Sequence, residues 1–195
     1  MLSHIRPAVV MIALFTGVLG VAYPLAVTGV AQAAFPDQAN GSLVRDKAGQ
    51  VVGSALVGQT FSQPGYLHPR PSAAGDGYDA AASSGSNLGP LNPDLIARVK
   101  ADAEKLRVEA GKAVVPADAV TTSASGLDPH ISPAYARLQI ARIARARGIG
   151  EAQVREVVEQ HVEGRTFGVL GQPRVNVLLT NRALDARFAR PAAEG

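Results

Sequence analysis

An uncharged run near the N-terminus most constrains how this chain can fold. Residues 7–36 include no formally charged side chain, and Arg6 is the only charged residue in the first 36 positions. As a helix, residues 7–31 would span about 37 Å, which exceeds the roughly 30 Å hydrocarbon core of a bilayer. The sequence therefore predicts a transmembrane helix over residues 7–31, preceded by a short cytoplasmic N-terminus of residues 1–6.

A cleaved signal peptide is the alternative for this segment. His4 and Arg6 supply a modest basic region, and Ala31-Gln32-Ala33 matches the A-x-A cleavage pattern. The apolar part of a signal peptide, however, usually runs only about 7–15 residues. The length therefore favours a retained anchor, and both interpretations place the following domain outside the cytoplasm.

The rest of the chain has the size of one domain with its own core. It is too short for a complete ion pump or a kinase. The formal net charge of +3 excludes a polybasic nucleic-acid surface. Because the sequence has no cysteine, disulfide frameworks, thiolate metal sites and cysteine nucleophiles are excluded as well.

The predicted fold class is α+β: one N-terminal transmembrane helix, then a single compact soluble domain over residues 37–186. A β-hairpin is expected over residues 42–58, where Asp46 to Gly49 form the turn and the second strand runs from Gln50 to Val57. Two stretches rich in Gly, Pro and Ser, residues 59–93 and 113–131, are expected to be irregular but ordered.

About three helices are expected in this domain. Each of the first two begins with a polar N-cap followed by proline and ends at a glycine. The expected helices are Asn92-Pro93 to Gly111, Ser132-Pro133 to about Arg147, and about Gly150 to Glu163. Within residues 164–186, Val175 to Leu179 fit a strand and the start of a helix equally well. Residues 187–195 are expected to form a disordered tail.

Candidate catalytic groups are sparse. Ser125, Asp128 and His130 lie within six residues of one another, which is too close in sequence for a triad to converge easily on one acyl carbon. A secreted or membrane-anchored hydrolase that uses Ser125 or His130 nevertheless stays the alternative function. No histidine pair has metal-ligand spacing, and Gly111-Lys112 lacks the remainder of a phosphate-binding loop.

The second predicted helix is rich in arginine. Because its arginines spread over more than half of the helix circumference, we interpret them as a solvated or carboxylate-paired face and not as a DNA-reading surface. The residues are Arg137, Arg142, Arg145 and Arg147.

Six stretches are distinctive in their order and spacing. They are GSALVGQ at residues 53–59, RPSA at 70–73, GSNLGP at 85–90, SASGLDPHISP at 123–133, HVEGR at 161–165 and LGQPRVNVL at 170–178. Together with the single N-terminal anchor, they closely resemble the KdpC family. Its members are the C subunits of the bacterial high-affinity potassium-transporting ATPase, the KdpFABC complex. The resemblance covers about residues 5–186.

The resemblance implies a non-catalytic subunit with partners KdpA, KdpB and KdpF. In the family, KdpA resembles a potassium channel and KdpB is the P-type ATPase. KdpC is a single-pass protein of the bacterial inner membrane that is needed for assembly and acts as a catalytic chaperone raising the ATP affinity of KdpB. The resemblance therefore implies that this chain needs no cofactor of its own and affects ATP binding through KdpB.

The distinctive stretches lie mostly in predicted loops, which is where binding residues concentrate. We therefore expect the two irregular stretches to dock on partner subunits. Six residues are candidates for interface contacts or for holding the loops in place: Arg70, Asn87, Asp128, His130, Arg165 and Asn176.

Overall fold

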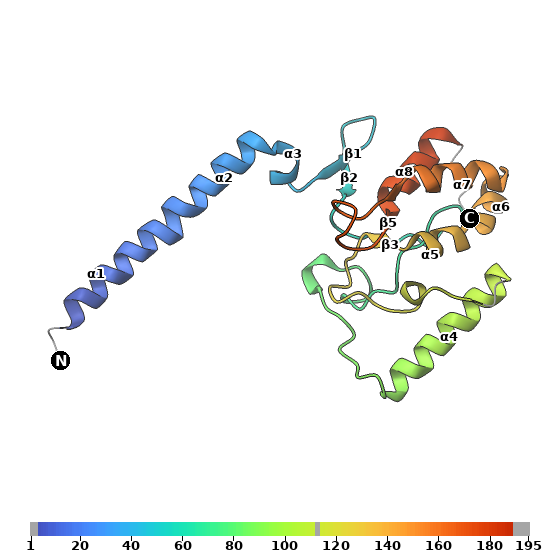
Figure 1. Cartoon of the computed structure of the whole chain (residues 1–195), viewed down its shortest axis with the longest axis horizontal. Helices are drawn as coiled ribbons and strands as arrows, with labels where there is room; N and C mark the ends of the chain where they lie inside the picture. The colour runs from blue at the N-terminus through green and yellow to red at the C-terminus, as the bar shows by residue number, and fades with distance from the viewer. Residues whose placement is uncertain (1–3, 112–113, 189–195) are drawn as a thin grey trace. The chain divides into compact units, whose positions relative to one another are not determined.

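A computed structural model of the chain describes residues 4–111 and 114–188. The chain divides between Ser54 and Ala55 into two compact units. The first unit holds the apolar helix and the β-hairpin, and the second holds all the remaining elements (Figure 1).

The first unit begins with one 30-residue helix over Ile5–Ala34, whose most apolar window has a mean hydropathy of 2.1 and no buried residue. By length and composition it can cross a membrane. It consists of α1 (Ile5–Phe15), the π-helical η2 (Thr16–Ala22) and α2 (Tyr23–Ala34). The π-helical turn ends just before Pro24. Because the proline ring would clash with the carbonyl four residues earlier in a regular α-helix, a wider turn here avoids that conflict.

The short helix α3 (Pro36–Ala39) leads into the predicted hairpin. Strands β1 (Leu43–Arg45) and β2 (Val51–Ser54) pair antiparallel. Asp46 Oδ1 accepts hydrogen bonds from the backbone N–H groups of Ala48 and Gln50, and Gly49 adopts a φ of +79°. The hairpin and its turn are therefore confirmed. The second strand is shorter than predicted, because pairing stops at Ser54.

The second unit is built around a small antiparallel sheet with the strand order β3-β5-β4. The strands are β3 (His130–Ile131), β4 (Val162–Glu163) and β5 (Arg174–Asn176). Helices α5 (Pro133–Leu138), α6 (Ile140–Arg147), α7 (Glu151–Gln160) and α8 (Val177–Arg187) form the core with it. Fully or nearly fully buried side chains from these elements include Ile131, Ile140, Ile143, Val154, Val158, Val175 and Leu184. The α+β class is confirmed.

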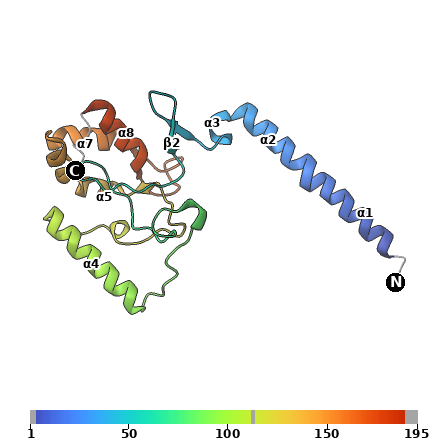
Figure 2. The same ribbon diagram turned by 180° about the vertical axis from the view of Figure 1, so that it is seen from behind.

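Helix α4 (Pro93–Ala110) has the predicted bounds: Asn92 Oδ1 caps it by accepting from Asp94 N, and Gly111 ends it with a φ of +58°. None of its residues is buried, although Leu106 packs partly against the core. The irregular segments lie between α4 and the sheet with its helices in both views (Figures 1 and 2). They hold the 3₁₀ turns η3 (Ala80–Ala82) and η4 (Ala117–Ala119).

Besides the second strand of the hairpin, three other predicted element boundaries were wrong. The second helix is divided at Gln139 into α5 and α6, since the Gln139 N–H bonds to a carbonyl only three residues back. The third ends at Gln160, because Val162 pairs with Val175 in the sheet and leaves the helical path. The tail was predicted to begin at residue 187, but Arg187 is the last residue of α8.

The stretch from Val175 to Leu179, which fitted a strand and a helix equally well, contains the end of β5 and the start of α8. Strand β5 ends at Asn176, whose side-chain oxygen then caps α8 by accepting from Leu179 N. Phe188 packs partly against the core, so the predicted tail cannot begin before residue 189. Residues 189–195 of that tail lie outside the described part of the chain.

Candidate functional site

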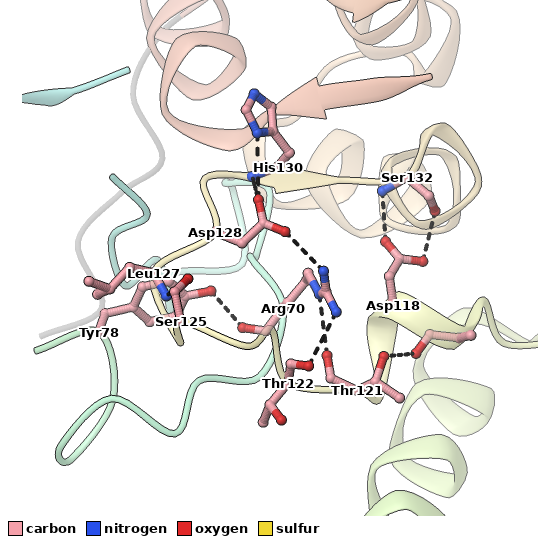
Figure 3. A network of polar contacts seen from close by, with 11 residues as sticks. Arg70, Tyr78, Asp118, Thr121, Thr122, Ser125, Leu127, Asp128, His130 and Ser132 are labelled. Atoms are coloured by element: carbon pink, nitrogen blue, oxygen red, sulfur yellow. Dashed lines mark hydrogen bonds and ion pairs between the residues drawn. The ribbon is translucent and has the colours of Figure 1, made fainter. Parts of the chain in front are cut away.

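The predicted site residues Arg70, Asp128 and His130 come together in one polar network (Figure 3). Arg70 Nη1 lies 2.9 Å from Asp128 Oδ2. The other carboxylate oxygen, Oδ1, accepts from the backbone N–H of His130 at 2.9 Å, and the His130 ring nitrogen Nδ1 lies 3.5 Å from it. Burial alone would raise the pKa of Asp128, but the hydrogen bonds from His130 and Arg70 outweigh it and lower this pKa.

Arg70 also joins its own segment to the second irregular stretch. Its Nε donates to the carbonyl of Thr121 and its Nη2 to the carbonyl of Thr122, both at 3.3 Å. The Tyr78 hydroxyl donates to the Arg70 carbonyl at 2.7 Å. Burial, with the nearby charge of Asp128, raises the pKa of Tyr78. One guanidinium therefore connects residues 70–78 to residues 121–128, which are far apart in the sequence.

The two irregular segments approach so closely because glycine lies at their contacts. Gly126 has a φ of +68°, and a Cβ there would lie 2.7 Å from Ala74 Cβ, Ala74 N and Ser84 O. A Cβ on Gly58 would lie 2.7 Å from the Asp128 carbonyl. The SGLDPHISP run thus has a packing role, since its glycine is required both by its backbone angle and by its neighbours.

Asp118 fixes the end of the same run. Its two carboxylate oxygens accept from the backbone N–H and the hydroxyl of Ser132 at 2.7 and 2.8 Å. The Ser132 hydroxyl oxygen in turn accepts from Tyr135 N at 3.0 Å and caps α5, as predicted. The second irregular segment therefore holds the start of α5 in place.

A hollow of about 570 Å³ opens beside this network. Its lining combines charged, polar and apolar groups from both irregular segments and from the start of β5. The lining residues are Arg70, Ala117, Asp118, Asp128, His130, Ile131, Ser132, Gln172, Pro173 and Arg174. Since the carboxylates already accept hydrogen bonds from Arg70, His130 and Ser132, they stabilise the wall of the hollow.

The structure brings a fourth predicted residue to this network and leaves two outside it. Asn176 pairs with His130 across β3 and β5, and its side-chain N–H donates to Ala55 O at 2.8 Å. Asn87 lies on an exposed stretch with a φ of +51°. Arg165 lies in the loop between β4 and β5, where it donates to Gln172 Oε1 at 3.0 Å.

Two buried amides that the sequence analysis missed hold the first irregular segment. Asn181 accepts from Leu67 N at 2.7 Å and donates to Leu67 O at 3.0 Å. Gln139 makes the same reciprocal pair with the backbone of His68, at 2.8 and 3.0 Å. An amide at an otherwise apolar helix position is the only signal the sequence offers for such a clamp, because its partner lies at least 70 residues away.

The arginine-rich helix is paired with carboxylates, as one of the two interpretations held, but the side chains of two of its arginines are also largely buried against the first irregular segment. The Arg147 side chain is fully buried, donating to Gly65 O at 2.6 Å and pairing with Asp185 at 2.8 Å. Arg142 donates to Pro64 O and Tyr66 O and pairs with Glu109 of α4. Arginine has enough donors to satisfy several loop carbonyls at once, which explains its burial here. Arg137 pairs with Glu159 on the surface, as predicted.

The alternative hydrolase chemistry finds no support in this geometry. The Ser125 hydroxyl oxygen accepts from Leu127 N, while the His130 ring faces Asp128 (Figure 3). Among residues 4–111 and 114–188, no three His, Asp or Glu side chains gather in a way that could hold a metal ion. What the network can do is hold two long loops in one conformation.

Comparison with known proteins agrees with the resemblance. The family described as "KdpC: K+-transporting ATPase, c chain" matches residues 5–186. A protein of Caulobacter sp. (strain K31), named "Potassium-transporting ATPase KdpC subunit", is 65% identical over 195 residues, all of both chains. Proteins of the same name from Beijerinckia indica and Myxococcus xanthus are 60% and 62% identical. These matches cover 96% of this chain and 96% and 88% of the two relatives, respectively. The chain belongs to the KdpC family, the non-catalytic accessory subunits of potassium-transporting ATPases.

Proposed function

We propose that this chain assembles and stabilises a high-affinity potassium-uptake ATPase and raises the ATP affinity of its KdpB subunit as a catalytic chaperone. Its partners are KdpA, KdpB and KdpF. The helix Ile5–Ala34 anchors the chain in the bacterial inner membrane. The second unit lies on the external side of that membrane.

The observation that carries this proposal is family membership over residues 5–186, which include the apolar helix and the polar network. The loops of the network carry three of the six distinctive stretches. They are held by Arg70, Gln139 and Asn181. A surface that is ordered before binding loses less conformational entropy on association, so this arrangement favours docking.

ATP affinity changes through the complex and not through a nucleotide site on this chain. The sequence has no phosphate-binding loop, and the proposed external location separates the second unit from cytoplasmic ATP. The effect is then a coupling free energy between two sites, which is typically about 1–3 kcal/mol. The chain needs no cofactor of its own.

Reconstitution of the complex with and without this chain tests the proposal. With the full chain present, tagged KdpB should co-purify with KdpA and KdpF, and the KM for ATP should fall about 5- to 150-fold. Calorimetry of the full chain alone with ATP should give no binding heat. An unchanged KM in a complex that contains the chain would reject the chaperone role, while failure to co-purify would reject assembly.

The topology can be tested with single engineered cysteines, because the chain has no native one. Val108→Cys places a thiol on an exposed position of the second unit, and Val30→Cys places one in the apolar helix. A membrane-impermeant reagent should label Val108→Cys from the outside of intact cells. Val30→Cys is the matched control and should stay unlabelled. Labelling of Val108→Cys only in inverted vesicles would refute the external location.

A further inference from the structure

The loop between β4 and β5 presents an apolar tip to solvent. Phe167 is 90% exposed, Val169 71% and Leu170 59%. Scattered exposed apolar residues are ordinary on protein surfaces, but three that are strongly exposed within four positions of one loop require an explanation. We call residues 165–171 the tip loop.

The tip loop is held in one conformation by its own hydrogen bonds. Thr166 and Leu170 exchange two backbone hydrogen bonds of 2.9 Å, and Gly168 N donates to Arg165 O at 3.0 Å. Strands β4 and β5 continue the pairing below the loop. The apolar side chains are therefore presented on a small, ordered hairpin.

Phe167 also adopts an unfavourable backbone conformation. Its φ is +54°, in the left-handed region that bulky residues rarely occupy. A glycine would adopt this angle more easily, but at this position the chain has phenylalanine. Backbone strain of this kind concentrates at binding sites, where the surrounding structure maintains it. The loop's own hydrogen bonds maintain this conformation in the free chain, and burial of the ring by a partner would add the apolar contact that the exposed ring lacks.

We propose that the tip loop inserts into an apolar cleft of a protein partner, where Phe167 is the central anchor. This inference rests on the proposed function, since it assigns part of the surface by which the chain joins its complex. Aromatic side chains that fill a pocket carry much of the energy of protein interfaces. Phe167 therefore contributes more than Val169 or Leu170.

The charges beside the tip loop favour a protein cleft over a lipid surface. Arg165 donates to Gln172, and Arg174 pairs with Glu163 at 2.8 Å. The charge of Arg174 is thus paired with a carboxylate, and Arg165 bonds to a neutral amide, whereas attraction to anionic lipid relies on clusters of several Lys and Arg near the surface. A fluid lipid surface also does not require a fixed loop conformation, but a shaped cleft does.

The tip loop leads directly into residues that line the hollow beside the polar network. Gln172, Pro173 and Arg174 follow it directly in the chain and line that hollow together with Arg70 and His130. A partner that buries Phe167 would therefore also cover the polar network, so that one surface uses both the ordered loops and the apolar tip.

The test compares Phe167→Ser with Val108→Ser in the full chain. Val108 is 78% exposed on α4, outside both irregular segments, and serves as the matched control. With tagged KdpA or KdpB in detergent, Phe167→Ser should lower the amount of this chain recovered about tenfold, as expected for an interface anchor. Val108→Ser should bind like wild type. Neither substitution should change the unfolding temperature of the free chain, since both side chains are exposed.

A third variant separates the ring from the backbone. Phe167→Gly relieves the positive φ, so the free chain should be at least as stable as wild type, yet the loss of recovery should match that of Phe167→Ser. Wild-type recovery of Phe167→Ser would overturn the inference while leaving the proposed function intact. Failure of the wild-type chain to recover any partner would reject both. A loss seen in lipid nanodiscs but not in detergent would assign the tip loop to lipid and overturn the protein cleft.

Discussion

Replacing Gly126 by alanine should destabilise the second unit more than the same change at Gly148. The two glycines have φ angles of +68° and +65°, so the left-handed backbone costs an alanine about the same at both sites, roughly 1–2 kcal/mol. A Cβ at Gly148 would have no neighbour within 4 Å. A Cβ at Gly126 would meet Ala74 Cβ, Ala74 N and Ser84 O at 2.7 Å.

Two of these three atoms belong to the backbone, so the clash cannot be relieved by rotating a side chain. Overpacking of this kind costs about 1–3 kcal/mol. The expected free-energy losses are therefore about 1–2 kcal/mol for Gly148→Ala and about 2–5 kcal/mol for Gly126→Ala. The difference between them measures the contact of residues 123–128 with residues 72–84.

Urea unfolding of the full chain in detergent, followed by tyrosine fluorescence, provides the assay. Three of the four tyrosines, Tyr66, Tyr78 and Tyr135, lie in the second unit. Equal losses of unfolding free energy in the two variants would refute the close packing of the irregular segments. A larger loss in Gly148→Ala would mean that the end of α6, not the loop contact, limits the stability of this unit.

Further predictions concern the polar network and the amide clamps. Arg70→Ala should lower the unfolding free energy by about 1–3 kcal/mol, because it leaves the half-buried Asp128 without its cation, and a double-mutant cycle with Asp128→Asn should show positive coupling. Burial and the nearby Arg142 charge lower the pKa of His68. Folding therefore favours its neutral form, and stability should be full above the unfolded pKa of about 6.5 and decline as the pH falls below it. Asp128, whose pKa is also lowered, stabilises the fold above its unfolded pKa of about 3.9, and this contribution is lost as the pH falls through the lower folded pKa. Unfolding measured from pH 8 to 3 should lose the first slope in His68→Gln and the second in Asp128→Asn; unchanged slopes would contradict these assignments. Asn181→Leu should cost about 2–4 kcal/mol, since both backbone groups of Leu67 lose their partner, and chymotrypsin should then cleave after Tyr66 faster than in wild type.

Much of the local structure was predictable from the sequence. The apolar helix, the hairpin turn at Asp46 to Gly49 and the caps at Asn92 and Ser132 follow from hydropathy and from side chains that bond to nearby backbone. These features depend on residues a few positions apart, so the local pattern contains the information. The six distinctive stretches likewise sufficed to identify the KdpC family over residues 5–186.

The conformation of the irregular segments could not be read in the same way. Arg142 and Arg147 pair with carboxylates, which was one of the two interpretations, but they also donate to the carbonyls of residues 64–66, more than 75 positions earlier, which no local pattern indicated. Gln139 interrupts a helix that the capping residues predicted as continuous, and its side chain holds the backbone of His68. Among the candidate site residues, only tertiary structure separated the network of Arg70, Asp128 and His130 from Asn87 and Arg165.

The sequence by itself determined that the chain has one apolar helix long enough to cross a membrane, an α+β unit after it, and the family to which it belongs. Tertiary structure decided how residues 59–92 and 114–129 become a single ordered surface. The physical reason is that a loop without repeating hydrogen bonds must satisfy its backbone groups with distant side chains. Which guanidinium or amide reaches which carbonyl depends on packing between segments, and no local pattern encodes that choice.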